Sequence, residues 1–470
     1  METLQRMANR GSISTGYDID NSVKLETANN EWFYNASPTA GNRRTFTFSF
    51  WIKRTALGTI NASGTQFVAG QGQHGRMHFS GDYFQFRFDD GHDVRDMTTK
   101  HRDTAAWLHV VVAVDTNQSS SSNRVKIYFN GVQTTTIDFD GGSYPDIEDQ
   151  GTWFNTNYLT VGTAPFAGSY SGGDGDYDMS GYLADFAAVD GTQYAPTDFG
   201  EFDEDSGIWK PKDLSDITWG DEGFYLKFDD SSSLGADSSG NSNNLTVNNI
   251  AAADQSQDSP SNNFCTWNPL WVYASQPIIS EGATKVRYSD STDEGAKATI
   301  GLTNGKWYWE AKPVGTIGSQ YIGIQTDGDS NIASNANSML NNYTMIINPT
   351  GRYYSYSGSL SESADQGWDL TASDWLGVAL DMDSSTQTIK YYKNGSLMQS
   401  LDLISDMQDR TVFPFLINYE NRSWDINFGG YTINTISSAA TDANGYGTFE
   451  YAPPSGYYAL CTKNLAEFGG

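Results

Sequence analysis

A strand–loop–strand unit that ends in Asn-Gly occurs twice in this chain and restricts the folds open to it. WLHVVVAVD (107–115) and WLGVALDMD (375–383) are continuous apolar runs, and they precede VKIYFNGV (125–132) and TIKYYKNGSL (388–397). Asn-Gly favours a type I′ hairpin turn, because both central residues of that turn need positive φ. The apolar runs are typical of central strands buried on two faces. The repeat predicts two β-sandwiches of related architecture.

The surrounding sequence also has the character of a β-protein. Aromatic residues make up 14% of the chain, whereas long runs of Ala, Leu, Glu and Lys at helical spacing are missing. Nearly alternating apolar segments include FTFSFWIKR (46–54), DYFQFRFDD (82–90) and GKWYWEAKPV (305–314). We therefore predict an all-β fold, in which two antiparallel β-sandwich domains are joined by a polar, acidic linker.

The predicted organisation has five parts. They are an N-terminal anchoring arm (1–20), a first sandwich (21–197), an acidic, polar connector (198–280), a second sandwich (281–430) and a C-terminal docking tail (431–470). The connector opens with FGEFDEDSG, but its GFYLKF segment (223–228) is suited to pair with the first sandwich. The tail contains CTKNL, which echoes CTWNPL at 265–270.

Charge and the first residues limit the partners. The formal charge is −29, from 57 acidic and 28 basic residues, so the field of the protein opposes a phosphate backbone or an anionic membrane surface. No run of about 18 apolar residues is present. We expect neither a nucleic-acid partner nor membrane insertion.

The first residues, METLQRMANRGSISTGYDIDNS, have no apolar segment after their arginines, so we expect no secretory signal.

The two cysteines, Cys265 and Cys461, are too few for a disulfide framework in a chain of this size. We expect buried free thiols, with a bridge between the two as the alternative.

Each half resembles a known family of β-sandwiches. The first resembles a laminin-G-like, concanavalin A-like jelly roll, through KLETANNEWFYNASP, FTFSFWIKR, WLHVVVAVD, VKIYFNGV and GYLADFAAVDGTQYAP. The second resembles a SPRY domain, through GKWYWE, YIGIQTDG, WLGVALDMDSSTQTIKYYKNG and VFPFLINY followed by INFGG. The resemblances cover about 21–197 and 281–430 and imply a jelly-roll architecture for both sandwiches.

Taken with RGSISTGYDIDNS, DSSGNSNNLTVNN, SPSNNFCTWNPL and PPSGYYALCTKNL, the chain looks like the modular virion proteins of tailed bacteriophages. That resemblance implies a non-enzymatic structural protein of the tail-fibre or adhesin type, assembled in the host cytoplasm and exposed on the released particle. We expect attachment to other virion proteins through residues 1–20, binding to host cell-surface glycan, and a homo-oligomer. The alternatives are a head decoration or head-fibre protein, a glycan-degrading jelly-roll enzyme, and a bacterial adhesin or lectin, which the missing export signal disfavours.

GRYYSYSGS (351–359) supplies the candidate ligand-binding residues. At strand spacing Tyr354 and Tyr356 share one face, and Tyr353 lies on the other. An exposed tyrosine suits sugar binding, because its ring is an apolar platform with a polar tip. Burial in the core is the alternative, since a strand must bury one face.

SGGDGDYDMSG (171–181) supplies the candidate metal ligands Asp174, Asp176 and Asp178, because Ca²⁺ favours several oxygen ligands at a flexible turn. The loop departs from the EF-hand pattern, since Met179 stands where that pattern has glycine. The resemblance to jelly rolls that hold calcium in a loop makes Ca²⁺ the candidate cofactor. An exposed acidic loop is the alternative.

Two further groups bear on catalysis. Glu201, Asp203 and Asp205 of EFDED share a face if extended, as paired glycosidase carboxylates would, but the charge run favours a solvated linker. Four histidines, His74, His78, His92 and His101, invite a metal interpretation. However, the first two would lie about 13 Å apart along a strand, which favours loop histidines. We expect His109 to be a partly buried residue with its hydrogen bonds satisfied.

Overall fold

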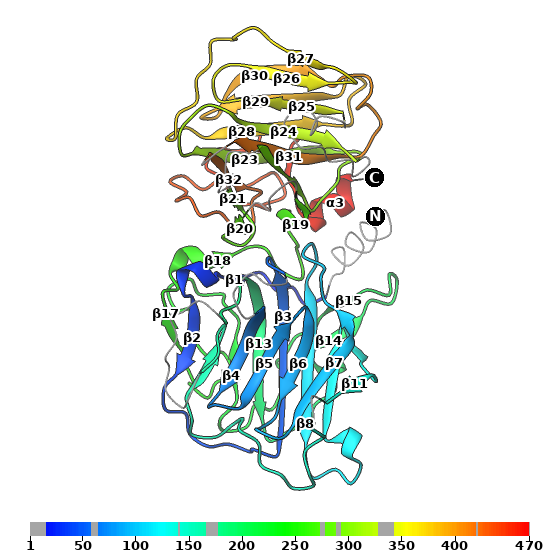
Figure 1. Ribbon diagram of the computed structural model, residues 1–470, viewed down its shortest axis with the longest axis vertical. Helices are drawn as coiled ribbons and strands as arrows, with labels where there is room; N and C mark the ends of the chain where they lie inside the picture. The colour runs from blue at the N-terminus through cyan, green and yellow to red at the C-terminus, as the bar shows by residue number, and fades with distance from the viewer. Residues whose placement is uncertain are drawn as a thin grey trace. The chain divides into compact units, whose positions relative to one another are not determined.

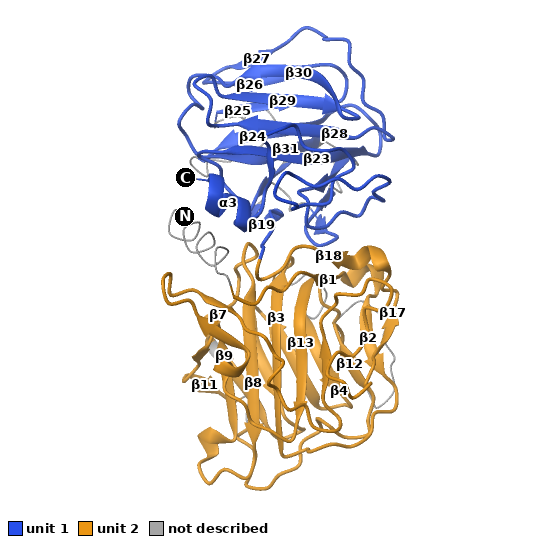
Figure 2. Cartoon of the chain, turned by 180° about the vertical axis from the view of Figure 1, so that it is seen from behind, with its two compact units in different colours: residues 1–13, 262–470 blue, residues 14–261 orange. Residues whose placement is uncertain are grey.

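The structure, a computed structural model, contains two compact units, formed by residues 14–261 and by residues 262–470 (Figures 1 and 2). It describes residues 16–57, 64–139, 142–165, 177–272, 278–287, 293–327, 343–419 and 422–469. Among these residues, no helix is long and apolar enough to cross a membrane.

The first unit is a sandwich of two eight-stranded antiparallel sheets. One sheet, here called the β3 sheet, has the order β10 (Val132–Gln133), β9 (Val125–Phe129), β8 (Leu108–Asp115), β3 (Thr45–Arg54), β13 (Gly181–Asp190), β1 (Ser22–Leu25) and β18 (Gln255–Ser256), with β16 (Phe224–Leu226) also paired to β13. The β5 sheet has the order β11 (Ile137–Asp138), β7 (Asp93–Lys100), β6 (Tyr83–Arg87), β5 (Gly75–Ser80), β4 (Thr65–Gln71), β12 (Leu159–Val161), β2 (Trp32–Asn35) and β17 (Thr246–Asn248).

Aromatic and β-branched side chains fill the space between these two sheets. Alternate residues of β8 point into this core, and they include Val110, Val112 and Val114. Val111, on the opposite face of the strand, packs with Phe199 and Leu214 from outside the sandwich. The strand is therefore buried on both faces, as its continuous apolar run predicts.

Residues 194–261 lie in the first unit, and Phe199, Leu214 and Ile217 of this segment pack against the outer face of the β3 sheet. Besides β16, β17 and β18 they form a small hairpin of β14 (Gly200–Phe202) and β15 (Trp209–Pro211). The pairing of GFYLKF, as β16, with the first sandwich is confirmed. The connector predicted over 198–280 is thus divided between the units, with residues 262–280 in the second.

The predicted arm, 1–20, is described only from residue 16. The Ile19 side chain is buried, and its amide donates to Ser261 Oγ at 2.8 Å. The remainder of the arm lies outside the described residues.

The second unit is also a sandwich. The β24 sheet has the order β19 (Trp267–Val272), β22 (Asp293–Ala298), β31 (Val412–Tyr419), β24 (Gln320–Thr326), β25 (Thr344–Ile347), β26 (Tyr353–Tyr356) and β27 (Leu360–Glu362). The β23 sheet has the order β20 (Ile278–Ser280), β21 (Lys285–Arg287), β32 (Ser423–Asn427), β23 (Lys306–Val314), β28 (Leu376–Asp381), β29 (Thr388–Lys393) and β30 (Ser396–Asp402). β33 (Tyr458–Ala459) adds to β23 in parallel.

Helical structure is sparse in the described residues. One α-helix, α3 (Thr462–Phe468), accompanies four 3₁₀ turns, η1 (Thr27–Asn29), η2 (Ser121–Asn123), η3 (Pro196–Asp198) and η4 (Ala252–Asp254). The predicted all-β class with two antiparallel sandwiches is therefore confirmed.

The repeated unit occupies equivalent places in the two sandwiches. Asn130 and Gly131 join β9 to β10, Asn394 and Gly395 join β29 to β30, and all four residues have positive φ. The side-chain oxygen of Asn130 accepts the His109 amide at 2.8 Å, and that of Asn394 accepts the Trp375 amide at 2.8 Å. Each asparagine therefore forms part of the turn and also binds the start of a more distant strand, β8 for Asn130 and β28 (Leu376–Asp381) for Asn394.

The two echoing cysteine segments lie side by side. The Cys265 amide donates to Leu460 O at 2.9 Å, and Phe264 forms an isolated β-bridge with Cys461. Both cysteines are buried, and no disulfide joins them. Burial raises the pKa of the Cys461 thiol to about 12, so this sulfur stays protonated and behaves as a small apolar group.

Candidate functional site

An aromatic surface lies on the outer face of the β24 sheet. We call it the aromatic face; its members come from β19, β24, β25, β26 and β31 and are Trp271, Tyr321, Ile346, Tyr354, Tyr356, Phe415 and Ile417. Alternation along β24 and β31 turns neighbours such as Ile322 and Leu416 into the core. The rings of Trp271, Tyr321, Tyr354 and Tyr356 are half-buried, so part of each remains open to solvent.

Tyr354 lies at the polar edge of the aromatic face. Its ring packs edge-on against Tyr321, with centroids 5.2 Å apart. Its hydroxyl accepts from Asn348 Nδ2 and donates to Glu362 Oε1, each at 3.3 Å, and Glu362 is also paired with Arg352. Burial, together with Tyr321 and Glu362, raises the pKa of Tyr354, so the hydroxyl remains a donor at neutral pH.

Lys297 supplies a positive charge at the opposite edge. Its Nζ lies 4.4 Å from the centre of the Trp271 ring and donates to Thr326 O at 2.8 Å. Burial lowers the pKa of Lys297 to about 8, so the ammonium form is still dominant near neutral pH. A cation over the indole orients that ring within the face.

The structure separates the three predicted tyrosines. Tyr354 and Tyr356 lie together on the aromatic face, while Tyr353 packs against the core of the sandwich. Sequence alternation indicated this division. Trp271 and Tyr321 were missed, because only the strand order β19-β22-β31-β24-β25-β26 brings them to the same face.

The predicted calcium ligands are only partly described. Asp174 and Asp176 lie outside the described residues. Asp178 is buried, its carboxylate accepts from the Thr163 hydroxyl, and its carbonyl accepts from Thr27 Oγ1 at 3.0 Å. Asp178 thus serves to join segments of the sandwich.

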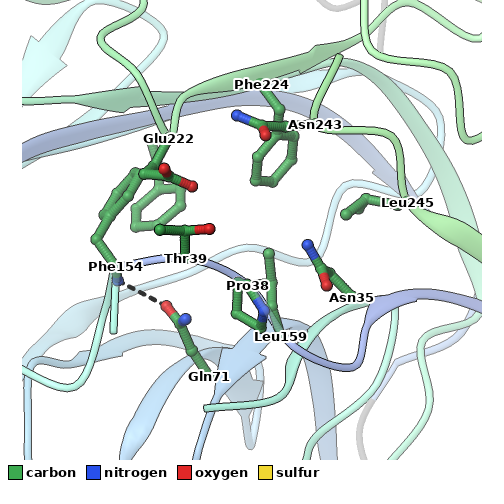
Figure 3. Close-up of a pocket in the computed structure, with 11 residues that line it drawn as sticks. Asn35, Pro38, Thr39, Gln71, Phe154, Leu159, Glu222, Phe224, Asn243 and Leu245 are labelled. Carbon is green, nitrogen blue, oxygen red and sulfur yellow. Dashed lines mark hydrogen bonds between the residues drawn. The ribbon is translucent and has the colours of Figure 1, made fainter. Parts of the chain in front are cut away.

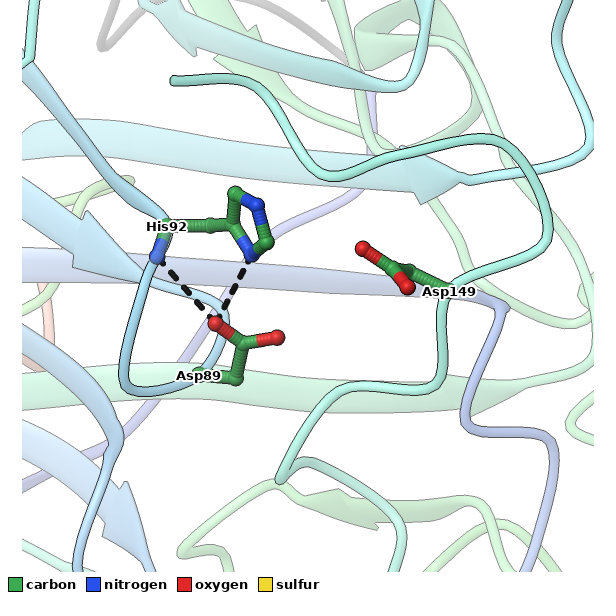
Figure 4. Close-up of side chains that lie close together, drawn as sticks. All are labelled: Asp89, His92 and Asp149. Atoms are coloured by element: carbon green, nitrogen blue, oxygen red, sulfur yellow. Dashed lines mark hydrogen bonds and ion pairs between the residues drawn. The ribbon is translucent and has the colours of Figure 1, made fainter. Parts of the chain in front are cut away.

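A different group could hold a metal ion. Among the described residues, Asp89, His92 and Asp149 each bring one ligand atom within 4.8 Å of the others (Figure 4). Asp89 and His92 share the β6–β7 turn, where His92 Nδ1 lies 2.8 Å from Asp89 Oδ1, and Asp149 faces them from another loop. One imidazole and two carboxylates suit Zn²⁺ better than Ca²⁺, which prefers oxygen ligands. The sequence did not indicate this group, because Asp149 is far from Asp89 and His92 along the chain.

His109 forms the hydrogen bonds expected of it, although it is fully rather than partly buried. Trp209 Nε1 donates to His109 Nδ1 at 3.0 Å, and Ser49 Oγ lies 2.9 Å from Nε2. An indole N–H can only donate, so Nδ1 is unprotonated and the proton of the neutral ring is on Nε2. Nε2 therefore donates to Ser49, which is the opposite of what a general base requires. Burial lowers the pKa of His109 to about 3.

The acidic EFDED segment forms part of an exposed hairpin. Glu201 lies on β14 and pairs with Lys210 at 3.3 Å, and Asp203 pairs with the same lysine at 3.4 Å. Hydrogen bonds from Ser206 lower the pKa of Asp203. Asp205 is exposed in the following turn. These carboxylates do not form a buried acid and base pair.

A pocket opens at one rim of the first sandwich (Figure 3), with about 410 Å³ of empty space that includes solvent at its mouth. Its floor is apolar, and its rim carries amide and carboxyl groups; the lining is Asn35, Pro38, Thr39, Phe48, Gln71, Phe154, Leu159, Glu222, Phe224, Asn243 and Leu245. Burial, with Asp190 and Asp221 nearby, raises the pKa of Glu222. Such a lining could hold a small ligand with an apolar body.

Comparison with known proteins identifies the class of the first sandwich. The family model described as the concanavalin A-like lectin/glucanases superfamily matches residues 22–192. The first unit thus has the concanavalin A-like jelly-roll fold that the sequence resemblance implied. A search among curated proteins found no match.

Similar solved structures include a SPRY domain and a carbohydrate-binding module. The SPRY domain of human HERC1 has 15% identity over 36% of this chain and 99% of its own, with a TM-score of 0.27. The carbohydrate binding module CBM66 from Bacillus subtilis has 10% identity over 35% of this chain and 93% of its own, with a TM-score of 0.26.

Proposed function

We propose that this protein binds carbohydrate through the aromatic face. The observation that carries the proposal is the set of four half-buried rings, with hydroxyl, amide and carboxylate groups at their edge. A pyranose ring presents C–H groups on one face and hydroxyls at its rim, so it fits such a platform. The match of residues 22–192 to a lectin and glucanase superfamily supports the same class of ligand.

The proposal extends to a structural protein of a bacteriophage virion, of the tail-fibre or adhesin type. Its support is the sequence resemblance, which combines the two sandwiches with RGSISTGYDIDNS and PPSGYYALCTKNL. Residues 1–20 would attach the chain to other virion proteins, and copies would form a homo-oligomer. The particle would assemble in the host cytoplasm and present the sandwiches to host-surface glycan after release. A head decoration or head-fibre protein is the alternative, and position on the particle distinguishes the two.

The proposed role is binding without catalysis. The Ser49–His109 pair has the proton on the wrong nitrogen, and Glu201 and Asp205 are exposed, which favours a binding protein. A glycan-degrading jelly-roll enzyme is the alternative. The enzyme would be favoured if the protein released sugar from host polysaccharide and if replacing Glu201 and Asp205 abolished that release.

Replacing Tyr354 or Trp271 with alanine is expected to weaken glycan binding about tenfold. Loss of one ring from the contact removes about 1.5 kcal/mol of apolar burial, and each 1.4 kcal/mol is about a factor of ten in affinity. Isothermal titration calorimetry measures the affinity of each variant for glycans that bind the wild-type protein.

The matched control is Tyr392→Ala, a tyrosine of the same unit that packs against the core cluster around Tyr308 and Phe449. It is expected to keep the wild-type affinity. Thermal melting of all three variants verifies that they fold. If folded Tyr354→Ala and Trp271→Ala bind glycan with the wild-type affinity, the aromatic face is not the binding site.

A further inference from the structure

A buried lysine of the first unit contacts two carboxylates. Lys24 lies on β1 between Val23 and Leu25, which point into the core of the sandwich. Alternation along the strand turns Lys24 to the outer face of the β3 sheet. Its Nζ lies 2.9 Å from Glu31 Oε2 and 2.9 Å from Asp254 Oδ1. We call Lys24, Glu31 and Asp254 the lysine cluster.

Two separate parts of the fold bring the lysine cluster together. Strand β18 begins directly after Asp254 and pairs with β1 (Figure 1), and the next position of that register sets Asp254 opposite Lys24. Glu31 reaches the same amine from the segment between η1 and β2, where Asn29 Nδ2 donates to Glu31 Oε1 at 2.9 Å. The cluster therefore joins the first strand of the unit to one of its last segments.

Water has little access to the lysine cluster. The side chains of Lys24, Glu31 and Asp254 are 1%, 4% and 10% exposed. Tyr182 of β13, fully buried, stands opposite Lys24 in the sheet. One ammonium group and two carboxylates are thus held away from solvent, where ionic charges are costly. A reaction that replaces a buried ion pair by a neutral group is favoured in such a place.

We propose that Lys24 and Asp254 form an intramolecular amide bond, an isopeptide, with Glu31 as the proton carrier. Two of the three ammonium protons pass from Nζ to Asp254 Oδ1 through Glu31. The electron pair freed on Nζ forms a bond to Asp254 Cγ, and the Cγ–Oδ1 bond breaks to release one water molecule. The third proton stays on the amide nitrogen. An ammonium group and a carboxylate thus become an amide and water, and no oxidant or other reactant takes part.

The contacts of Glu31 suit the transfer of protons. Lys24 Nζ lies 2.9 Å from each of the two Glu31 oxygens, so the carboxylate touches the reacting nitrogen directly. Burial raises the pKa of Glu31 to about 7, with Lys24 opposing the shift and Asp254 adding to it. A group with a pKa near the working pH can both accept and release a proton.

The two oxygens of Asp254 are prepared for different roles. Oδ2 accepts the Ala251 amide at 2.8 Å, and this donor stabilises negative charge on Oδ2 while Cγ is tetrahedral. Oδ1 faces Lys24 and is the atom that leaves. Nζ already contacts an oxygen bonded to the carbon that it attacks, so little movement separates the pair from reaction. The product keeps the Ala251 contact, because Oδ2 becomes the amide oxygen.

Lys53 and Asp258 provide an internal comparison. This pair is also buried, and Lys53 Nζ lies 2.7 Å from Asp258 Oδ2. The other oxygen, Oδ1, accepts from the Trp107 indole at 3.0 Å. An indole N–H can only donate, so it cannot take a proton from the ammonium group and pass it on as Glu31 can. We therefore expect the amide bond at Lys24 and an ordinary ion pair at Lys53.

An amide bond between residues 24 and 254 changes what the unfolded chain can do. It closes a loop that contains most of the first unit, and a cross-link over a long loop restricts the unfolded state. Denatured protein with the bond is therefore more compact, and the first unit melts at a higher temperature than without it. This modification does not depend on the proposed binding of glycan.

Intact mass measurement of the full chain under denaturing conditions, after the folded protein has stood at neutral pH, tests the proposal. The wild-type protein is expected to weigh one water molecule less than its sequence predicts. Because an aspartyl succinimide also loses water, fragmentation of a proteolytic digest must show a branched peptide that joins Lys24 to Asp254. Trypsin should no longer cut after Lys24. The unmodified mass, or loss of water without this branched peptide, overturns the proposal.

The variants test the role of Glu31. Glu31→Gln keeps the shape of the side chain but cannot carry protons, so it is expected to lose the branched peptide and to have the mass of its sequence. Glu201→Gln is the matched control, because it removes a carboxylate paired with Lys210 on the surface of the same unit, and it is expected to keep the bond. A wild-type yield of the branched peptide in Glu31→Gln, or an equal yield of one joining Lys53 to Asp258, contradicts the proposal. If Glu31→Gln melts early, the wild-type mass and digest decide. No ligand enters this test, so its outcome is distinct from that of the glycan experiments.

Discussion

Asp258→Asn is expected to lower the free energy of unfolding of the first unit by about 3–5 kcal/mol, the effect of breaking a buried charge pair. Asp258 Oδ2 accepts from Lys53 Nζ at 2.7 Å, and Oδ1 accepts from the Trp107 indole at 3.0 Å. The side chains of Lys53 and Asp258 are only 0% and 1% exposed. Asparagine preserves the shape but leaves the Lys53 ammonium buried without this carboxylate.

Urea denaturation, followed by circular dichroism and tryptophan fluorescence, measures the effect. Glu201→Gln is the matched control, because it removes a carboxylate paired with Lys210 on the surface of the same unit, where ion pairs contribute little. A denaturation midpoint for Asp258→Asn no lower than that of Glu201→Gln would show that this pair does not hold residues 250–261 against the β3 sheet.

Glu310→Gln is expected to destabilise the second unit by about 2–3 kcal/mol and to loosen its C-terminal segment. Glu310, on β23, is fully buried and accepts the backbone amides of Glu450 and Tyr451, each at 2.8 Å. A glutamine has one acceptor oxygen, so one of these two amides would face an NH₂ group. Leaving a buried donor without its acceptor costs about 1–3 kcal/mol.

Hydrogen exchange at the Glu450 and Tyr451 amides, together with urea denaturation, tests this expectation. Glu467→Gln is the control in the C-terminal segment, since Glu467 is exposed and accepts from Asn444 Nδ2 at 3.1 Å. Protection of both amides in Glu310→Gln at the level of the control would mean that other contacts hold the segment.

Local signals made the repeated unit predictable. Apolar runs and Asn-Gly pairs are properties of a few consecutive residues, and they indicated β8, β28 and both hairpin turns. The asparagine side chains add a contact that the sequence did not reveal, because His109 precedes Asn130 by 21 residues and Trp375 precedes Asn394 by 19. The period of a strand was also sufficient to divide Tyr353 from Tyr354 and Tyr356.

The features that the sequence did not predict depend on contacts between residues far apart in the chain. Residues 198–280 were predicted to be a polar connector. The Ser22 hydroxyl nevertheless donates to Asp258 O across 236 positions, and Phe199 and Leu214 pack against the β3 sheet. His109 obtains its hydrogen-bond partners from positions 60 and 100 residues away. The aromatic face depends on strand order and register, which the local pattern of a single sequence does not encode.

The central claim is that the chain is a carbohydrate-binding protein whose ligand lies on the aromatic face. A glycan array probed with the intact protein, and with a variant in which both Trp271 and Tyr354 are alanine, tests it most directly. The account predicts saturable binding of the wild-type protein to a defined set of glycans, with the signal from neutral glycans lost in the folded variant. No saturable binding to any glycan, or an identical pattern from the two proteins, would contradict it.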